Sequence, residues 1–445
     1  MKKTFRIGGI HPDDSKLSAG AAIGQMPLCP EMSISMAQHL GAPATPVVAV
    51  GDKVKVGQVI GEPSGFISGF VHSSVSGTVK SVGPMPDIAG NPVPHVVITV
   101  EGDQWDESID RTDTVGAVPP VSAAEIVEKV RTCGIVGLGG ASFPTHVKLN
   151  PPKDKKAEVL IINGTECEPY ITSDDRLMRE RPEQVVRGAS LIMKALGVDC
   201  CYIGVEENKK EAVSCLRKAV RNHLGISVVE LAKKYPQGGE KQLIDSVIRR
   251  QVPSGALPID VGAVVQNVAT AYAVYEAVYK NKPLISNIVT VSGRSLASQL
   301  NLEVRIGTPV SAILEYAGVT LEDGVKVISG GPMMGKAVAN LNATTVKANG
   351  AFTILTGKET LRVAESPCIR CGKCAQACPM GLEPWLLSRL FRAGDRNAEL
   401  EQERVFDCIE CGCCQYTCPA GIPLLDSIRL GKADVMKIIR SRSKK

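Results

Sequence analysis

Apolar and polar residues alternate along residues 45–83, where glycines interrupt the alternation every few positions. Val54, Val56 and Val59 each stand beside polar or glycine neighbours, and a second alternating stretch begins at Val71. A period of two is typical of strands that bury one face and expose the other. The pattern therefore predicts short, half-buried β-strands in this part of the chain.

From about residue 116 the pattern changes to one of helices and buried strands. Ser122 and Glu125 form a capping box after the Pro-rich stretch 118–120, which predicts a helix that runs to about Thr132. Helical spacing then covers 182–196 and 209–223, and strand-like apolar runs cover 157–163 and 201–205. Alternating helices and strands predict an α/β layer over 116–283.

The residue pattern in the last third of the chain predicts two smaller domains and a C-terminal tail. Strand-like runs at 288–293 and 302–306, followed by a helix start at Pro309, indicate a β-grasp-like module over 284–357. A helical run that begins near Glu383 predicts that residues 358–430 form an α-helical domain rather than a compact ferredoxin β-fold. The fold class is thus a multidomain α+β chain, with domains over 1–115, 116–283, 284–357 and 358–430 and a basic tail over 431–445.

Composition and charge narrow the class of protein. The 445 residues suffice for three or four domains, and 44% hydrophobic with 22% charged residues is typical of a globular protein. A net charge of +5 is too small to indicate a nucleic-acid partner. Six cysteines lie outside the two strings described below without framework spacing, which favours a reducing compartment. We expect the cytosolic side.

The sequence also predicts how the chain relates to membranes. The N-terminus lacks an apolar run behind its early positive charge, so no secretory signal is expected. The apolar stretch 261–279 contains Gln266, Asn267, Thr270 and Glu276, and it is interpreted as a buried helix instead of a membrane span. Any membrane association should therefore be peripheral. The basic tail is either solvated or in contact with anionic lipid or an acidic partner.

Two cysteine strings near the C-terminus share the spacing C-x2-C-x2-C-x3-C-P. Four thiolates converging from different directions are what a cubane 4Fe-4S cluster requires, and the two-residue gaps let a tight turn present three of them. Two strings predict two clusters. Zinc or disulfides are the alternatives, but zinc sites favour separated C-x2-C pairs. The expected ligands are Cys368, Cys371, Cys374, Cys378, Cys408, Cys411, Cys414 and Cys418.

In two-cluster ferredoxins the fourth cysteine of each string usually binds the other cluster. We therefore pair the first three cysteines of the first string with Cys418, and the corresponding three of the second string with Cys378. Cys413 breaks the register that relates the strings, so we expect it to be a packed neighbour thiol.

A glycine-rich segment over 137–148 offers a second kind of chemistry. Three glycines and Lys148 fall within one turn, where exposed backbone N–H groups could hold a phosphate. Alone the signal is weak, because such a segment is more often only a turn and lacks the common nucleotide fingerprints.

Four segments follow one another in this order: G-L-G-G-A-S-F-P-T-H-V-K at 137–148, N-G-T-E-C-E-P at 163–169, Y-P-Q-G-G-E at 235–240 and Q-N-V at 266–268. Together they resemble the flavin-binding NADH subunit of respiratory complex I. The resemblance implies that Gly137, Gly139, Gly140 and Lys148 hold the FMN phosphate, and that Asn163, Tyr235, Gly238 and Asn267 surround the flavin. It implies further that Glu166, Glu168 and Glu240 line the same cavity, with Phe143 stacking on the nucleotide. Leu138, Ser142, Thr165 and Gly239 depart from that family's pattern. Each carboxylate alone could equally be a solvated surface residue.

The β-rich start of the chain resembles the barrel-sandwich hybrid of biotinyl and lipoyl carrier domains. Those domains attach their cofactor to a lysine at a hairpin tip, where this chain has Gly-Phe-Ile-Ser-Gly at 65–69, so no swinging arm is expected. His72 has no ligand-spaced partner and is expected to be a strand or turn residue.

Characteristic features span nearly the whole chain: G-G-I-H-P at 8–12, A-Q-H-L-G-A-P at 37–43, the β-rich segment, the flavin motifs, the β-grasp-like module and both cysteine strings. In this order they resemble the RnfC family, the C subunits of the Rnf ion-translocating electron-transport complexes. It implies a peripheral subunit on the cytoplasmic face of the bacterial membrane. It also implies that membrane partners couple NAD and ferredoxin redox chemistry to sodium or proton movement, with ferredoxin acting indirectly.

Taken together, these expectations predict one mechanism of electron transfer. NADH gives up two electrons together as a hydride, whereas each 4Fe-4S cluster accepts one, so FMN must stand between them. The hypothesis is that hydride passes to FMN near the catalytic positions Glu240 and Phe143 and that electrons leave through the clusters. The rivals are a soluble flavin and iron–sulfur reductase of the cobalamin-reductase type, and a non-catalytic adaptor with structural clusters.

Overall fold

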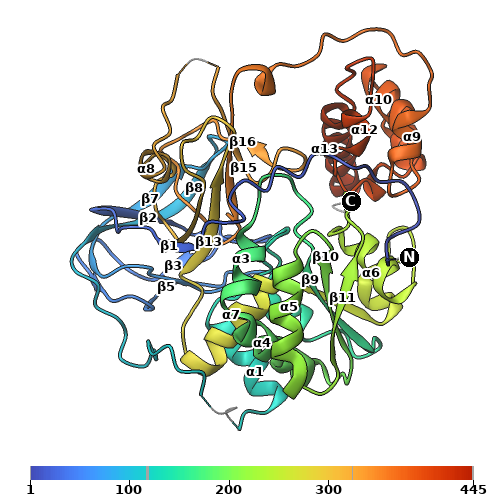
Figure 1. Cartoon of the computed structure of the whole chain (residues 1–445). Coiled ribbons are helices and arrows are strands. Elements are labelled where there is room, and N and C mark those ends of the chain that lie inside the picture. Colours follow the sequence, from blue (N-terminus) through green and yellow to red (C-terminus); the bar gives the residue numbers. More distant parts are fainter. Residues whose placement is uncertain (1, 117–119, 323, 443–445) are drawn as a thin grey trace.

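The structure is a computed structural model that describes residues 2–116, 120–322 and 324–442. Four parts follow one another along the chain (Figure 1). In this view the β-rich part lies at the left, the α/β part at the lower centre and the C-terminal helical part at the upper right, and the mixed sheet lies between the β-rich and the helical parts.

The first part is built of two small antiparallel sheets. One has the order β2-β8-β7-β4 and the other the order β3-β5-β6. The strands are β2 Glu31–Ser35, β3 Thr45–Pro46, β4 Lys53–Val54, β5 Val59–Glu62, β6 Val71–His72, β7 Gly77–Pro86 and β8 Pro92–Val100. The alternation found in the sequence is confirmed, because Val54, Val71 and Val79 point into a core that also holds Met32 and Ile98. His72 lies on a strand as expected, and burial lowers its pKa to about 3.

The α/β part has a four-stranded parallel sheet of order β11-β10-β9-β12. Its strands are β9 Val159–Gly164, β10 Cys201–Glu206, β11 Ile226–Leu231 and β12 Ala263–Asn267. Its helices are α1 Ala123–Thr132, α2 Thr145–Lys148, α3 Ser173–Glu180, α4 Pro182–Leu196, α5 Lys210–Ala219, α6 Glu240–Ile248 and α7 Val268–Lys280, with 3-10 turns at Val220–Asn222 and Pro258–Val261.

The capping box and two helix predictions are confirmed in this part. Ser122 Oγ accepts from the backbone N–H of Glu125, whose carboxylate accepts from the N–H of Ser122. Helix α4 has the bounds expected from its periodicity, and Gly197 ends it in the left-handed conformation with φ 66°. The helix expected over 209–223 ends earlier, at Ala219.

The interpretation of 261–279 as one buried helix is wrong over its first third. Gly262 turns the chain with φ 71°, and Ala263–Asn267 then form strand β12, which pairs with β9. The helix α7 begins only after Asn267, whose side chain accepts from the N–H of Ala269 as its N-cap. A short apolar run cannot be told from a helix by periodicity alone. Among the residues described, no helix combines the length and apolar character that crossing a bilayer requires.

The mixed sheet forms the third part, with the order β1-β14-β13-β17-β15-β16. It consists of β1 Ile23–Gln25, β13 Ser286–Ser292, β14 Leu300–Arg305, β15 Lys326–Ser329, β16 Lys336–Ala337 and β17 Ala351–Leu355, together with α8 Val310–Tyr316. The edge strand β1 comes from the start of the chain and pairs parallel to β14. The N-terminal stretch therefore does not stay within the β-rich first part.

The fourth part is helical, as the sequence predicted. After a 3-10 turn at Gly357–Thr360 it contains α9 Lys373–Ala377, α10 Pro384–Arg392, α11 Asn397–Gln402, a 3-10 turn at Val405–Asp407, α12 Cys413–Tyr416 and α13 Leu424–Arg442. Residues 358–442 contain no strand. Helix α13 continues without a break through residue 431, so the described portion of the basic tail, up to Arg442, is helical.

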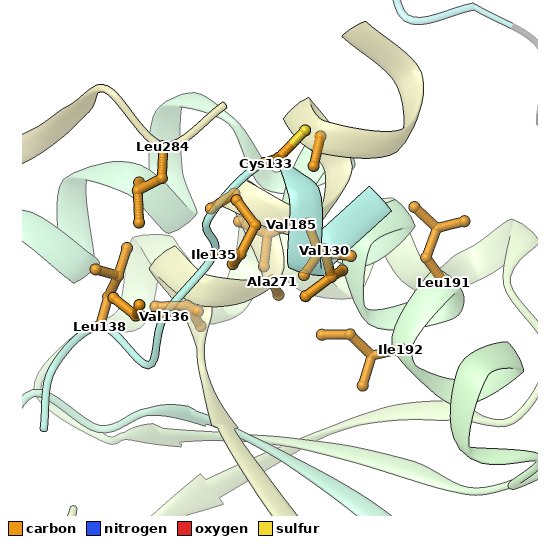
Figure 2. Packing of buried hydrophobic residues seen from close by; sticks show 14 of the residues in the cluster. Val130, Cys133, Ile135, Val136, Leu138, Val185, Leu191, Ile192, Ala271 and Leu284 are labelled. Atoms are coloured by element: carbon orange, nitrogen blue, oxygen red, sulfur yellow. The ribbon is translucent and has the colours of Figure 1, made fainter. Parts of the chain in front are cut away.

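One apolar core joins the first two parts. Figure 2 shows its centre, where Val130 of α1 meets Val185 of α4 and Ala271 of α7. Helices α4 and α7 lie close together because Gly188 faces the backbone of Ala271, where a Cβ would come within 1.8 Å of the carbonyl oxygen. This packing fixes the position of helix α7, whose N-cap is Asn267.

Candidate flavin and iron–sulfur site

The sheet order places a switch point between strands β9 and β12. From β9 the chain moves to β10 and β11 on one side, and it then returns to add β12 on the other side. In open parallel sheets, ligands bind outside the carboxyl ends of the strands at such a point. Asn163 and Asn267 lie there, directly opposite one another in the register of the two strands. The fold therefore brings together two residues that the sequence could relate only through resemblance.

The glycine-rich turn closes over this point. The backbone N–H of Gly137 donates to the carbonyl of Phe143 at 2.9 Å, so the residues between them form a loop. Gly139 has φ 77°, and a Cβ there would lie 2.7 Å from Nδ2 of Asn267. Gly140 is exposed and has no heavy atom within 4 Å of a Cβ position. The turn thus touches Asn267 at one glycine and leaves the next one open.

Residues after β11 complete the same edge. Asn163 Nδ2 donates to the carbonyl of Gly238 at 2.9 Å. A Cβ on Gly238 would come within 2.5 Å of the Thr165 hydroxyl, so this position has room only for glycine. Lys148 Nζ donates to Glu240 Oε1 at 2.7 Å and to the carbonyl of Val265 at 3.1 Å. Both side chains of this ion pair are about one third exposed, and they remain accessible from outside.

Glu166 is engaged in holding a helix. Its carboxylate accepts from the N–H groups of Asp174 and Asp175 at 2.7 and 3.2 Å, which lie in the first turn of α3. Burial raises the pKa of Glu166. Asp174 in turn accepts from Asn267 Nδ2 at 2.7 Å. The carboxylate of Glu166 therefore supports Asn267 through α3, and in this arrangement its oxygens face the helix terminus.

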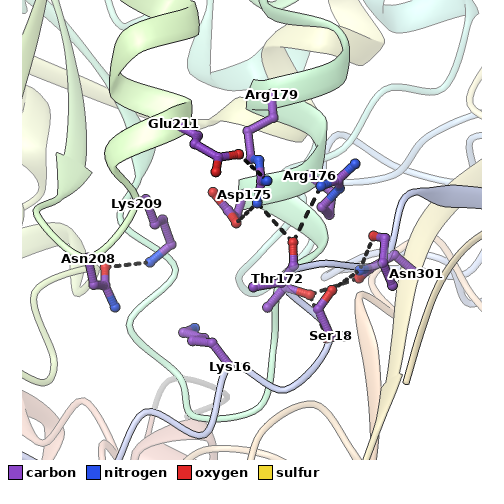
Figure 3. A network of polar contacts seen from close by, with 12 residues as sticks. Lys16, Ser18, Thr172, Asp175, Arg176, Arg179, Asn208, Lys209, Glu211 and Asn301 are labelled. Carbon is purple, nitrogen blue, oxygen red and sulfur yellow. Dashed lines mark hydrogen bonds and ion pairs between the residues drawn. The ribbon is translucent and has the colours of Figure 1, made fainter. Parts of the chain in front are cut away.

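Two lysines, the buried Lys209 and the partly buried Lys16, lie beneath the loop that carries Glu166 and Glu168. Lys16 Nζ donates to the carbonyls of Glu166, Glu168 and Ile171 at 2.7–2.8 Å. Lys209 Nζ donates to the carbonyl of Thr165 at 2.7 Å. Figure 3 shows both lysines beside the Ser18, Thr172 and Asn301 side chains that join this loop to the mixed sheet. Burial and the neighbouring Lys209 lower the pKa of Lys16.

Sequence reasoning missed both lysines. A lysine in an irregular N-terminal stretch has no local pattern, and its role appears only when residue 16 folds back on 166–171.

Glu168 and Tyr235 lie where the α/β part meets the cluster domain. The carboxylate of Glu168 accepts from the N–H groups of Met333 and Met334 at 3.2 and 2.7 Å. Tyr235 is 2% exposed, and its hydroxyl donates to the carbonyl of Cys411 at 2.9 Å. Burial raises the pKa of Glu168 to about 7. Tyr235 therefore contacts the second cysteine string, and Glu168 contacts the 333–334 loop of the mixed-sheet part, so neither of these two predicted flavin residues is bonded to the glycine-rich turn.

The second cysteine string and Cys378 share one cavity. The cavity is lined by Cys378, Cys408, Cys411 and Cys414 among apolar neighbours such as Leu387 and Ile428. Cys413 lines it as well and is fully buried. Cys378 comes from the first string, so the grouping is the one that exchange of the fourth cysteine predicts.

The first string lies nearer the surface. Cys368 and Cys371 are exposed, and Cys374 and Cys418 are partly buried. In the residues described, no group of three or more His, Cys, Asp or Glu side chains is close enough together to bind a single metal ion. A cubane presents four separate irons, so its ligands need to surround a volume instead of one point. Cys378, Cys408, Cys411 and Cys414 line one common cavity and fit that requirement.

The turn also fits a phosphate. Gly139 and Gly140 present backbone without side chains, and Lys148 adds a cation at the same edge of the sheet. Phe143 is half-buried at the end of the turn. The residues present can therefore hold a flavin phosphate, while their individual roles stay predictions.

Comparison with known proteins agrees with this architecture. Family models match in the expected order: the RnfC barrel sandwich hybrid domain over 3–103, the Nuo51 FMN-binding domain over 130–276, the SLBB domain over 288–337 and the 4Fe-4S dicluster domain over 360–419. The expected fold class is confirmed. An FMN-binding domain and a 4Fe-4S domain are both present.

Curated relatives match over most of their length. The C subunit of the proton-translocating ferredoxin:NAD(+) oxidoreductase complex of Clostridium ljungdahlii is 45% identical over 88% of this chain and 85% of its own. The C subunit of the Na(+)-translocating complex of Acetobacterium woodii is 44% identical over 97% of each. Among solved structures, an air-oxidised NAD+-reducing [NiFe]-hydrogenase aligns at TM-score 0.49 and 19% identity, covering 69% of this chain and 60% of that one. From the two curated relatives it follows that the chain belongs to the RnfC family, the C subunits of the ion-translocating ferredoxin:NAD(+) oxidoreductase complexes.

Proposed function

We propose that this chain is the NADH-, FMN- and 4Fe-4S-dependent electron-transfer subunit of a membrane complex. The complex would couple electron transfer between NADH and ferredoxin to Na+ or H+ translocation, with this subunit peripheral on the cytoplasmic face. The names of the relatives support the coupling, since one is proton-translocating and one Na(+)-translocating. The partners are the other subunits of the complex.

The α/β part would bind FMN at the switch point. Gly137, Gly139 and Gly140 provide open backbone for the phosphate, and Lys148 provides the neutralising cation. Asn163, Gly238 and Asn267 form the floor below it. Bound FMN would accept a hydride and release electrons singly, which is the chemistry that links NADH to iron–sulfur clusters.

Phe143 and Glu240 lie where the nicotinamide half of NADH would enter. Glu240 is paired with Lys148, and a carboxylate at this position can accept hydrogen bonds from ribose hydroxyls. Since both side chains are accessible, the pair can exchange its partners for those of a bound dinucleotide.

The helical part would hold two 4Fe-4S clusters. Cys408, Cys411, Cys414 and Cys378 would bind one of them around the cavity that they line together. The other would be bound by Cys368, Cys371 and Cys374 together with Cys418, which is close enough to Cys374 to influence its pKa. Cys413 is the neighbouring thiol that does not bind.

A single contact carries the proposal. The hydroxyl of Tyr235, in the segment after β11 that also supplies Gly238, donates to the carbonyl of Cys411. One residue pair thus joins the flavin edge of the sheet to the deeper cluster cavity, while Cys368 and Cys371 stand at the exposed end of the same domain. The deeper cluster is therefore the one next to the flavin, and the outer cluster faces partners.

The test is anaerobic reconstitution of the purified chain with iron, sulfide and FMN, followed by titration with NADH. The expected result is a flavin that bleaches with NADH and two clusters by iron count. A preparation that binds no flavin, or whose bound flavin ignores NADH, contradicts the proposal and leaves the adaptor as the better account. Recovery of the chain with washed membranes and integral partners would support the proposal, whereas a wholly soluble, active monomer would support a cobalamin-reductase-type enzyme.

A further inference from the structure

Two loops at one end of the β-rich domain form a single unit, which we name the barrel tip: residues 39–43 and 64–69. The N–H of Ala42 donates to the carbonyl of Ile67 at 3.1 Å, and the N–H of Gly69 donates to His39 Nε2 at 2.9 Å. Ser68 Oγ donates to the carbonyl of Ala42 at 3.0 Å. These bonds hold the loops together, so the barrel tip is a defined surface.

The barrel tip lies against the glycine-rich turn of the flavin site. The N–H of Leu40 donates to the carbonyl of Ser142 at 3.3 Å, one residue before Phe143. This contact joins the barrel directly to the loop that carries Gly139 and Gly140.

A second set of contacts, just behind the tip, fixes this junction. The fully buried Lys347 donates to the carbonyls of Phe70 and Gly134 at 2.9 and 2.7 Å. Gly134 approaches Phe70 so closely that a Cβ on it would lie 2.3 Å from the Phe70 carbonyl oxygen. The barrel tip therefore cannot move away from the turn without breaking buried hydrogen bonds.

The barrel tip exposes apolar side chains beside a turn that has almost none. Phe66 is 83% exposed, Leu40 is 54% exposed and Ile67 is 37% exposed. Across the junction, residues 139–141 are two glycines and an alanine, all exposed. The accessible apolar surface next to the flavin turn thus comes largely from a different domain.

We propose that the barrel tip is the binding surface for the adenosine half of NADH, with Leu40 and Phe66 packing against the adenine ring. The inference rests on the proposed function, since it extends the nucleotide site of the α/β part across the domain junction. It assigns a substrate-binding role to the segment 37–43, which the flavin chemistry leaves unused.

The chemistry of the ligand favours this occupant. A dinucleotide that places nicotinamide at the flavin carries a flat, apolar-faced adenine at its other end, and proteins hold such rings by stacking and apolar contact. The glycine-rich turn offers backbone and Lys148 for phosphates but only Phe143 as an aromatic ring. A protein partner is the other occupant of an exposed apolar surface, but continuity with the nucleotide turn favours the base.

The test compares NADH with reduced nicotinamide mononucleotide, which lacks the adenosine half. Steady-state reduction of an artificial electron acceptor is measured anaerobically with the reconstituted full chain, for the wild type and the variants Phe66→Ala and Leu40→Ala. Leu224→Ala is the matched control, because Leu224 is 98% exposed on the same chain but lies just before the amino end of β11, opposite the site.

The expected result is a rise of roughly 5- to 20-fold in KM for NADH in Phe66→Ala and Leu40→Ala, with kcat unchanged, as for the loss of one base-stacking contact. KM for the mononucleotide should stay at the wild-type value in both. The Leu224→Ala variant should match the wild type with both substrates.

Three outcomes would overturn the inference. The first is an unchanged KM for NADH, including the case in which the variants instead lose membrane partners. The second is an equal rise in KM for both substrates, which would place the effect at the nicotinamide end. The third is the same rise in the Leu224→Ala control. None of these outcomes bears on the proposed function, which fails if the wild type binds no flavin or does not oxidise NADH.

Discussion

Gly139 and Gly140 are neighbours in one turn, and the structure gives them opposite sensitivities to a methyl group. Alanine at 139 must adopt φ near 77°, which costs about 1 kcal/mol for a residue with a Cβ. Its Cβ would also lie 2.7 Å from Nδ2 and 3.2 Å from Cγ of Asn267.

Asn267 cannot simply turn aside. Its Oδ1 accepts from the N–H of Ala269 at 2.7 Å as the cap of α7, and its Nδ2 donates to Asp174 at 2.7 Å. Losing a helix cap costs about 1 kcal/mol, and weakening a hydrogen bond to a carboxyl group adds a similar amount. We therefore expect Gly139→Ala to lower the unfolding free energy of the flavin-free protein by about 2–3 kcal/mol.

Alanine at 140 meets no heavy atom within 4 Å and no positive φ. Its effect on stability should stay within about 0.5 kcal/mol, as for a surface substitution. If the turn holds a phosphate, the same methyl group should still hinder the approach of the ligand to the backbone. We expect FMN affinity to fall roughly tenfold, which corresponds to about 1.4 kcal/mol.

The assay is thermal melting of the flavin-free protein by circular dichroism, together with FMN titration followed by quenching of flavin fluorescence. For a domain of this size, 2–3 kcal/mol corresponds to a fall of about 4–12 °C in melting temperature. A wild-type melting temperature in Gly139→Ala would refute the steric argument. Undiminished FMN affinity in Gly140→Ala would remove the turn from the phosphate site.

Three further predictions concern the cysteines, Lys148 and a partly buried ion pair. The Cys371→Ser variant should lose about half of its iron after reconstitution while FMN stays bound, whereas the Cys413→Ser variant should keep all of its iron. Iron and sulfide analysis measures the difference, and equal iron in both variants would show that the ligand set is wrong. Lys148→Ala should weaken FMN retention on gel filtration, and full retention would exclude its phosphate role. Lys282 and Arg181 lower the pKa of the partly buried Glu303 to about 2 against the opposing effect of its burial, so the stability that this carboxylate contributes is complete above about pH 4.3 and is lost as pH falls towards 2. Glu303→Gln should therefore remove about 3 kcal/mol at neutral pH and flatten the acid limb of unfolding, which the exposed-pair control Glu31→Gln should not do.

What the sequence could predict depended on how local the signal was. The cysteine strings, the capping box at Ser122 and helix α4 each lie within one short segment, and each was found by spacing alone. The pairing of Asn163 with Asn267 joins residues on two strands, and only resemblance to a known flavin site brought them together. Strand β12 was missed because its five residues, of which only Ala263, Val264 and Val265 are apolar, stand directly before a helix and carry no period of their own.

The positions of Glu166 and Glu168 show a second limit. Resemblance assigns both to the nucleotide cavity, but the carboxylate of Glu166 caps α3 and that of Glu168 binds the backbone at Met333 and Met334. Which hydrogen-bond donors reach a carboxylate depends on segments more than 100 residues away, as the Met333 contact shows. A motif therefore identifies the residues of a site more reliably than it identifies their individual contacts.

The N-terminal stretch explains how the separate parts can work as one electron-transfer unit. Lys3 forms a bridge to Leu231, and Ile10 forms one to Tyr235. Between them, Gly9 donates its N–H to the carbonyl of Ala377 at 3.0 Å, beside Cys378 of the deeper cluster cavity. Gly8 lies so close that a Cβ there would be 2.3 Å from the Cys378 carbonyl oxygen.

The stretch then continues from the cluster domain to the flavin loop and the mixed sheet, as the dark blue segment in Figure 1 shows. Lys16 holds the loop 166–171 from below, and Ile23–Gln25 join the mixed sheet as β1. One continuous segment thus contacts the flavin edge, the cluster domain and the sheet whose Met333–Met334 loop binds Glu168. Electron transfer requires the electron carriers to keep a short and constant separation. Because the N-terminal segment contacts both carrier domains next to Tyr235 and Cys378, it holds the flavin domain and the cluster domain at a fixed distance from one another.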